Sequence, residues 1–150
     1  MKTIEEIIAE LRLEPHPEGG WFRRVFPSPV EKGEISSIYY LLGKEDFSSF
    51  HRLSAMTEIW YFLDGDPIDI HIIHSDGTLT THRLGELEYQ LVVRPDQWFA
   101  AEPAPGSSFC LVACAVSPSF DYEGFELAKR SVLQQQYPQH SELIQRLTRQ

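Results

Sequence analysis

Residues 50–65 read FHRLSAMTEIWYFLDG, and this segment carries the strongest structural signal in the chain. Aromatic and β-branched residues in its second half predict a strand that ends at the turn signal Asp64-Gly65. Because residues two apart share a face of a strand, Glu58 lies on the same face as Trp60. Such a carboxylate either faces water at the strand end or enters a pocket, and the residues alone leave both interpretations open.

The composition is typical of one folded domain spanning residues 1–150. Apolar residues make up 42% and charged residues 23% of the 150 residues, so the chain can bury a sizeable core. The formal net charge of -9 disfavours nucleic acid and anionic membrane surfaces as partners. We therefore expect neither a nucleic acid partner nor a membrane partner.

Two features predict a cytoplasmic protein. Residues 1–6, MKTIEE, contain acids where a signal peptide needs an apolar run, and no apolar stretch approaches the length of a membrane span. Cys110 and Cys114 are four residues apart in a predicted strand, about 13 Å at the usual rise per residue. This separation is too large for a disulfide between them, so we expect two buried, reduced thiols.

Hydrophobic periodicity predicts an all-β fold with helices near both ends. Thr3 and Glu6 form a capping box for a short N-terminal helix, and Ser141 is the expected cap of the last helix. The expected helices cover residues 4–12, 125–136 and 141–149. The expected strands cover residues 21–26, 35–42, 47–53, 57–63, 68–74, 78–84, 89–93, 98–102 and 108–116. Many short strands with frequent turn signals are typical of a β-sandwich or barrel.

His51, Leu53, Glu58 and Gly65 occupy the positions of the motif His-x-His, four residues, Glu, six residues, Gly. This spacing resembles the first motif of the cupin superfamily (RmlC-like jelly roll). Further matching segments are PHPEGGWFR at 15–23, YYLL at 39–42, WFAA at 98–101 and FDYEGFEL at 120–127. Together they resemble the fifth cupin family, a domain of unknown function. The resemblance implies a double-stranded β-helix (jelly roll), commonly a homodimer, with a pocket inside the barrel.

The metal-ligand positions of the cupin motifs are only partly retained. Leu53 replaces the second His of the first motif, and Phe99 or Ala100 stands where the His of a later motif falls. His51 and Glu58 remain, and two protein ligands hold a divalent ion weakly. We therefore expect no certain cofactor, with a divalent metal ion at His51 and Glu58 as the alternative.

His51 and Glu58 are the candidate catalytic residues. Without a metal they form a general acid–base pair, in which the His51 imidazole transfers the proton and Glu58 orients the imidazole. The alternative is a hydrogen bond that only satisfies two buried polar groups. The side chains expected to bind the ligand are Arg23 as an anion anchor, Trp60 and Trp98 as stacking walls, Gln90 as an amide, His71, and Tyr39 as one of several candidate acids. His16 either covers the pocket mouth or packs on the surface.

Three functions fit these residues, each with a small-molecule ligand and an expected homodimer. The first is a metal-independent epimerase or isomerase for a sugar or sugar nucleotide, with His51 removing a proton beside a carbonyl. The second is a non-catalytic ligand-binding or sensing cupin that uses the same pocket. The third is a metal-dependent enzyme with a degenerate ligand set. One scaffold of this kind supports many chemistries, so the fold does not choose among them.

Overall fold

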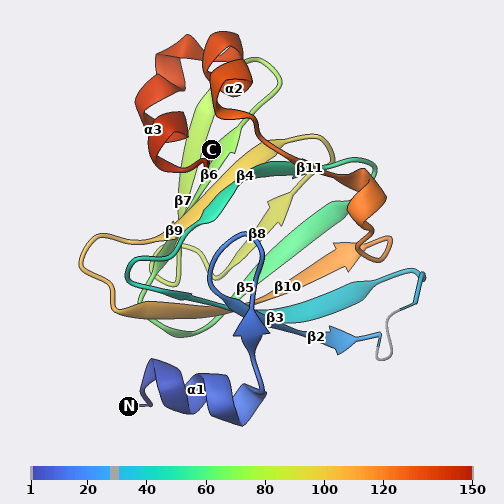
Figure 1. Ribbon diagram of the computed structural model, residues 1–150, viewed down its shortest axis with the longest axis vertical. Helices are drawn as coiled ribbons and strands as arrows, with labels where there is room; N and C mark the ends of the chain where they lie inside the picture. The colour runs from blue at the N-terminus through green and yellow to red at the C-terminus, as the bar shows by residue number, and fades with distance from the viewer. Residues whose placement is uncertain (1, 28–30, 150) are drawn as a thin grey trace.

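Two antiparallel sheets pack face to face in the computed structural model, which describes residues 2–27 and 31–149 (Figure 1). The first sheet has the order β1 (Glu14–Pro15), β2 (Trp21–Phe26), β3 (Ser36–Gly43), β10 (Phe109–Ser117), β5 (Thr57–Gly65) and β8 (Gln90–Val93). The second has the order β11 (Phe125–Leu127), β4 (Ser48–Leu53), β9 (Trp98–Pro103), β6 (Ile68–Ile73) and β7 (Leu79–Leu84). The predicted all-β architecture is confirmed.

The main core lies between the two sheets, because each strand sends alternate side chains inward. On β6 the inward residues include Ile70 and Ile72, and on the neighbouring β9 Phe99 faces the same way. Trp60 on β5 meets them from the first sheet, and all four side chains are at most 2% exposed. Burial on this scale is the largest favourable contribution to folding.

Helices cover the outer faces of both sheets, and Figure 1 shows the two groups at opposite ends of the molecule. Helix α1 (Ile4–Leu11) packs Ile7 against Leu41 on the outer face of the first sheet. Helices α2 (Arg130–Gln136) and α3 (Ser141–Arg146) pack Leu133 and Ile144 against Trp98 on the outer face of the second. Both outer faces are therefore partly buried, although neither lines the space between the sheets.

The capping box predicted for α1 is present. Thr3 Oγ1 accepts a hydrogen bond from the Glu6 amide at 3.2 Å, and Glu6 Oε2 accepts one from the Thr3 amide at 2.9 Å. We expect Thr3→Ala to lower the free energy of unfolding by about 1 kcal/mol, because the first turn loses a hydrogen-bond acceptor. Urea denaturation measures the change. Thr3→Ser keeps the hydroxyl and should recover most of it; equal stability of the Ala and Ser variants would contradict the assignment.

The C-terminal segment differs from the sequence prediction at two points. The helix expected over 125–136 is wrong in its first part: Phe125–Leu127 forms β11, which pairs with β4, and α2 begins at Arg130. The edge of β4 provides hydrogen-bond partners that local periodicity does not reveal. Ser141 is not the cap of α3 either, because the short 3₁₀ turn Pro138–His140 leads directly into that helix and His140 occupies the cap position.

Cys110 and Cys114 both lie on β10, and the structure confirms that they are buried and unpaired. Burial raises the pKa of Cys110 to about 12 and that of Cys114 well above its ordinary value, so both remain thiols at neutral pH. No helix within residues 2–27 and 31–149 combines the length and the apolarity needed to span a membrane.

Candidate functional site

A cavity of about 580 Å³ opens between the two sheets. Its walls come from the inner faces of β2, β3, β5 and β10 on one side and of β4 on the other. Residues from the segments 14–18, 31–32 and 120–125 complete the rim. Cavities of this size accommodate small organic molecules, and the sequence expectation of a pocket in the barrel is met.

His51 lies on β4 in the wall of the cavity and is 8% exposed. Its Nδ1 is 2.7 Å from the carbonyl oxygen of Ser49, which can only accept a hydrogen bond. Nδ1 therefore carries the proton, and Nε2 keeps its lone pair. Burial lowers the pKa of His51 to about 4, against the opposing effect of the Ser49 hydrogen bond. At neutral pH the side chain is thus an uncharged imidazole with a free basic nitrogen.

Glu58 lies on β5, between Val93 and Val116 on the neighbouring strands, and is also 8% exposed. Burial raises the pKa of its carboxyl group to about 7. The indole N–H of Trp60 is near enough to oppose this shift, yet it completes no hydrogen bond with the carboxyl oxygens. Glu58 consequently exchanges between its acid and ionised forms near neutral pH, as a general acid–base group must.

His51 and Glu58 line the same cavity from opposite sheets. Among the described residues, no hydrogen bond joins them, so the expectation that Glu58 orients the imidazole is wrong. The backbone carbonyl of Ser49 has that role. The alternative expectation, a His–Glu hydrogen bond that only satisfies two buried groups, is also corrected.

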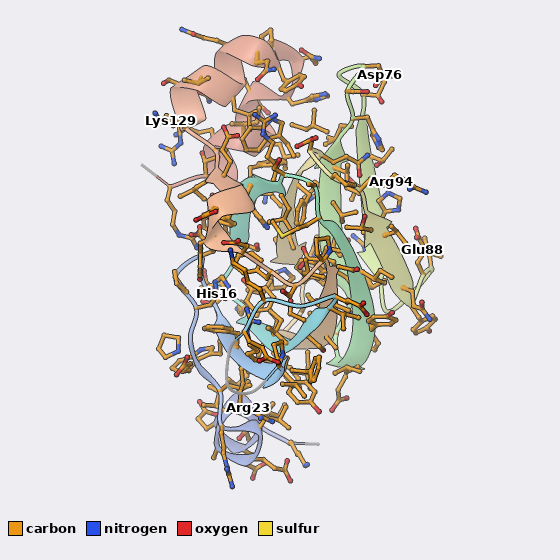
Figure 2. All side chains as sticks on the ribbon, turned by 90° about the vertical axis from the view of Figure 1, so that its right-hand side faces the viewer. His16, Arg23, Asp76, Glu88, Arg94 and Lys129 are labelled. Atoms are coloured by element: carbon orange, nitrogen blue, oxygen red, sulfur yellow. The ribbon has the colours of Figure 1, made fainter. Side chains whose placement is uncertain are left out.

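Trp60 lies in the cavity wall as expected, whereas two other ligand-binding candidates face the wrong side of the first sheet. Arg23 donates from Nε to the carbonyl of Leu11 at 2.5 Å, and its guanidinium lies over the ring of Tyr39, 5.5 Å from the centroid. Figure 2 shows Arg23 at the N-terminal end of the molecule, beside α1. Both candidates are therefore corrected: Arg23 and Tyr39 belong to the outer face.

The remaining three candidates also lie outside the cavity. Trp98 is buried beneath the C-terminal helices, with the Arg52 guanidinium 4.5 Å from its ring centroid. His71 lies on the same outer face of the second sheet and bonds Thr81 and Glu102, each at 2.8 Å. Gln90 is exposed on the edge strand β8. Each of these residues is next to a residue that points inward. The alternation alone did not show which residues face the cavity and which face the outer side of the sheet.

Several cavity residues were left unassigned or open by the sequence, and four of them concern ligand binding. Phe22, Arg24 and Tyr40 line the cavity. Arg24 and Tyr40 each directly follow a residue that was expected to bind the ligand and does not face the cavity. The buried Tyr40 hydroxyl donates to the carbonyl of Gly19 at 2.7 Å. Phe22 pairs with Tyr40 in the register of β2 and β3, so the two lie on the same face of the first sheet. The packing of the second sheet makes this face the inner one.

His16 is the fourth of these residues. The sequence left open whether it covers the pocket mouth or packs on the surface, and the structure places it in the cavity lining. Its Nδ1 accepts a hydrogen bond from the Glu18 amide at 2.9 Å, so Nε2 bears the hydrogen. Burial, together with the nearby His51 and Arg149, lowers the pKa of His16 to about 4. The two histidines of the cavity are both neutral at pH 7, and only His51 retains a lone pair on Nε2. Figure 2 shows His16 and Glu88 on opposite sides of the barrel.

The residues present do not fit a resident divalent metal ion. His51 and Glu58 are the only donors kept from the ligand set that the resemblance implied, and they are accompanied by apolar side chains. Leu53 and Phe99 are both buried, and the Phe99 ring centroid is 4.1 Å from that of His51. Nowhere in residues 2–27 and 31–149 do three His, Cys, Asp or Glu side chains gather as a metal site requires.

Two antiparallel sheets enclosing a cavity that carries His51 and Glu58 define a protein of the cupin class. The model of the family described as Cupin superfamily (DUF985) matches residues 5–128, and the chain belongs to this family.

Solved structures agree with this assignment. A protein of Shewanella oneidensis is 37% identical with a TM-score of 0.91, and the match covers 99% of both chains. A hypothetical protein from Leishmania major is 29% identical with a TM-score of 0.89, over 99% of this chain and 100% of that one. Oxalate decarboxylase of Bacillus subtilis shares the fold alone, at 14% identity and a TM-score of 0.62, over 89% of this chain and 36% of its own. Among curated proteins no match was found.

Proposed function

We propose that the cavity binds a small ring-bearing molecule of the sugar or sugar-nucleotide class and moves a proton on it without a metal ion. One observation carries this proposal: a neutral imidazole with a free Nε2 and a carboxyl group with a pKa of about 7 line one cavity from opposite sheets. A base and an acid on opposite walls suit the inversion of a carbon centre, in which one group removes a proton and the other returns one.

His51 Nε2 takes a proton from the carbon beside a carbonyl, and the electron pair of that C–H bond moves into a carbon–carbon double bond as the carbonyl becomes an enolate. Protonated Glu58 then gives its proton to the opposite face of the same carbon, and the carbonyl re-forms. The imidazolium and the carboxylate return to their starting states by exchange with solvent. The indole N–H of Trp60, buried with no acceptor, is available to the enolate oxygen.

Aromatic side chains support a ring-bearing ligand. The rings of Tyr40 and Trp60 meet edge to face, with centroids 5.9 Å apart. On the other wall the ring centroid of Phe125 lies 5.4 Å from that of His51. Faces and edges of such rings pack against sugar or base rings and contribute more than their buried area alone. The cavity therefore combines apolar walls with a few polar groups, as small-molecule sites do.

Deuterium exchange tests the proposal even though the product of the reaction is unidentified. The protein, pretreated with a chelator, is incubated in D₂O with a panel of sugar nucleotides, sugar phosphates and sugar acids, and each compound is followed by mass spectrometry. We expect a gain of one deuteron in at least one compound, because the carboxyl proton that Glu58 returns to the carbon has exchanged with D₂O. A compound that raises Tm without exchange would identify a binding protein instead. Exchange that the chelator abolishes would contradict a metal-independent mechanism.

A further inference from the structure

We propose that the ligand of this cavity is an anion and that Arg24 holds its carboxylate or phosphate group. This inference deepens the proposed function and rests on it only in taking the same cavity as the ligand site. Arg24 lies on the inner face of β2, opposite Ile38 of β3, and its side chain lines the cavity. The adjacent Arg23 faces outward, so the chain places only the second arginine of the pair in the cavity.

The guanidinium of Arg24 has an unused hydrogen-bond donor in the described part of the chain. Its Nη1 is buried and has no hydrogen-bond acceptor, and no carboxylate in the described part of the chain forms an ion pair with it. A guanidinium is always charged and only donates hydrogen bonds, so a buried N–H without an acceptor is costly. An anionic oxygen from a ligand removes this cost, and a planar fork of N–H groups fits carboxylate and phosphate oxygens in particular.

The acids around the cavity do not fill this role. Glu58 has a raised pKa, whereas a paired arginine would have lowered it. Asp121 is paired with Lys32 at 3.5 Å, and the charge of Arg149 opposes the rise that burial causes in the pKa of Glu18. None of the acids that line the cavity forms an ion pair with Arg24 in the described part of the chain, so its unused donor remains for a ligand.

Arg23 provides a matched control one residue away. Its Nε already donates to the carbonyl of Leu11, and its charge lies over the Tyr39 ring on the outer face. The two arginines lie on the same strand and have the same side chain, and they differ in which face of the sheet they occupy. A ligand in the cavity should depend on Arg24 and be indifferent to Arg23.

Titration calorimetry tests the inference with four probes: glucuronate for a carboxylate, glucose 1-phosphate for a phosphate ester, inorganic phosphate, and glucose as the neutral compound. We expect at least one anionic probe to bind the wild type more tightly than glucose. Arg24→Gln should weaken that probe about 10- to 100-fold, because a charge-assisted hydrogen bond is lost. Arg23→Gln should leave its affinity within about twofold, and Arg24→Lys should retain part of it because only the fork is lost. Which anion binds distinguishes a carboxylate ligand from a phosphate.

Equal binding of the anionic probes to wild type and Arg24→Gln would overturn the inference, as would anionic probes that bind no better than glucose at millimolar concentration. Thermal unfolding of each variant establishes that it is folded before titration. Because binding is measured without turnover, a failed deuterium experiment leaves this result standing. Conversely, deuterium exchange into a neutral sugar that Arg24→Gln does not slow would overturn the inference while supporting the proton-transfer chemistry.

Discussion

Glu58→Gln is expected to stabilise the protein by about 3 kcal/mol relative to wild type above pH 7, and to change its stability little at pH 4. The pKa of Glu58 is about 7 in the folded protein against 4.5 for the ordinary side chain. Between these values the folded chain holds a proton that the unfolded chain has released, so the wild type loses stability as the pH rises through this window. Glutamine keeps the shape of the protonated acid and has no charge to bury.

The pKa shifts of the two cavity histidines change the stability of the protein with pH in the opposite direction. His16 and His51 have folded pKa values of about 4, below the ordinary 6.5. Between these values the unfolded chain binds more protons, so their contribution to stability is present above pH 6.5 and is lost as the pH falls to 4. Both proteins contain these histidines, so their effect cancels in the difference between variant and wild type, which isolates Glu58.

Urea denaturation of wild type and Glu58→Gln from pH 4 to pH 8 measures that difference. It should rise steadily between about pH 4.5 and pH 7 and then level off. Glu18→Gln is a useful comparison, because Glu18 also belongs to the cavity rim but is only partly buried. A difference between Glu58→Gln and wild type that does not vary with pH would mean that the pKa of the Glu58 carboxyl is not raised by burial.

His51→Asn is expected to slow deuterium exchange into the substrate by about 10²- to 10⁴-fold, because asparagine has no basic nitrogen in place of Nε2. The wild-type rate should be highest between about pH 4 and pH 7. His51 is an unprotonated base above its pKa of about 4, and Glu58 is a protonated acid below its pKa of about 7. Exchange is followed by mass spectrometry on whichever compound the wild type labels.

His71→Asn is the control for this experiment. His71 is also a buried strand histidine, 7% exposed, but it bonds Thr81 and Glu102 outside the cavity. Its substitution should lower Tm without slowing exchange by the same factor in the folded protein. If His51→Asn labels the compound as fast as wild type, His51 is not the base, and Glu58 is left as the proton-transfer group.

Much of the fold was predictable because its signals are local. Turn residues and an alternating pattern place each of the nine expected strands within a few residues, as the paired segments β6 and β7 around Asp76-Gly77 illustrate. The short strand β1 was not expected. The resemblance of residues 51–65 to the first cupin motif implied a pocket with His51 and Glu58, and both side chains line the cavity. The strand Phe125–Leu127 was not predicted, because the strand it pairs with, β4, is distant in the sequence.

The sequence by itself determined the strand-rich architecture, the N-terminal cap, and the pair of titratable residues in the barrel. Only the tertiary structure decided which of two adjacent residues points inward: Arg24 rather than Arg23, and Tyr40 rather than Tyr39. Alternation has a period of two and is a property of one strand, whereas the inward face depends on where the second sheet and the helices pack. Both faces of these sheets are partly covered, so apolar residues occur on each and hydrophobicity does not mark the interior. The protonation states of His51 and Glu58 have the same origin, because burial is a property of the assembled barrel.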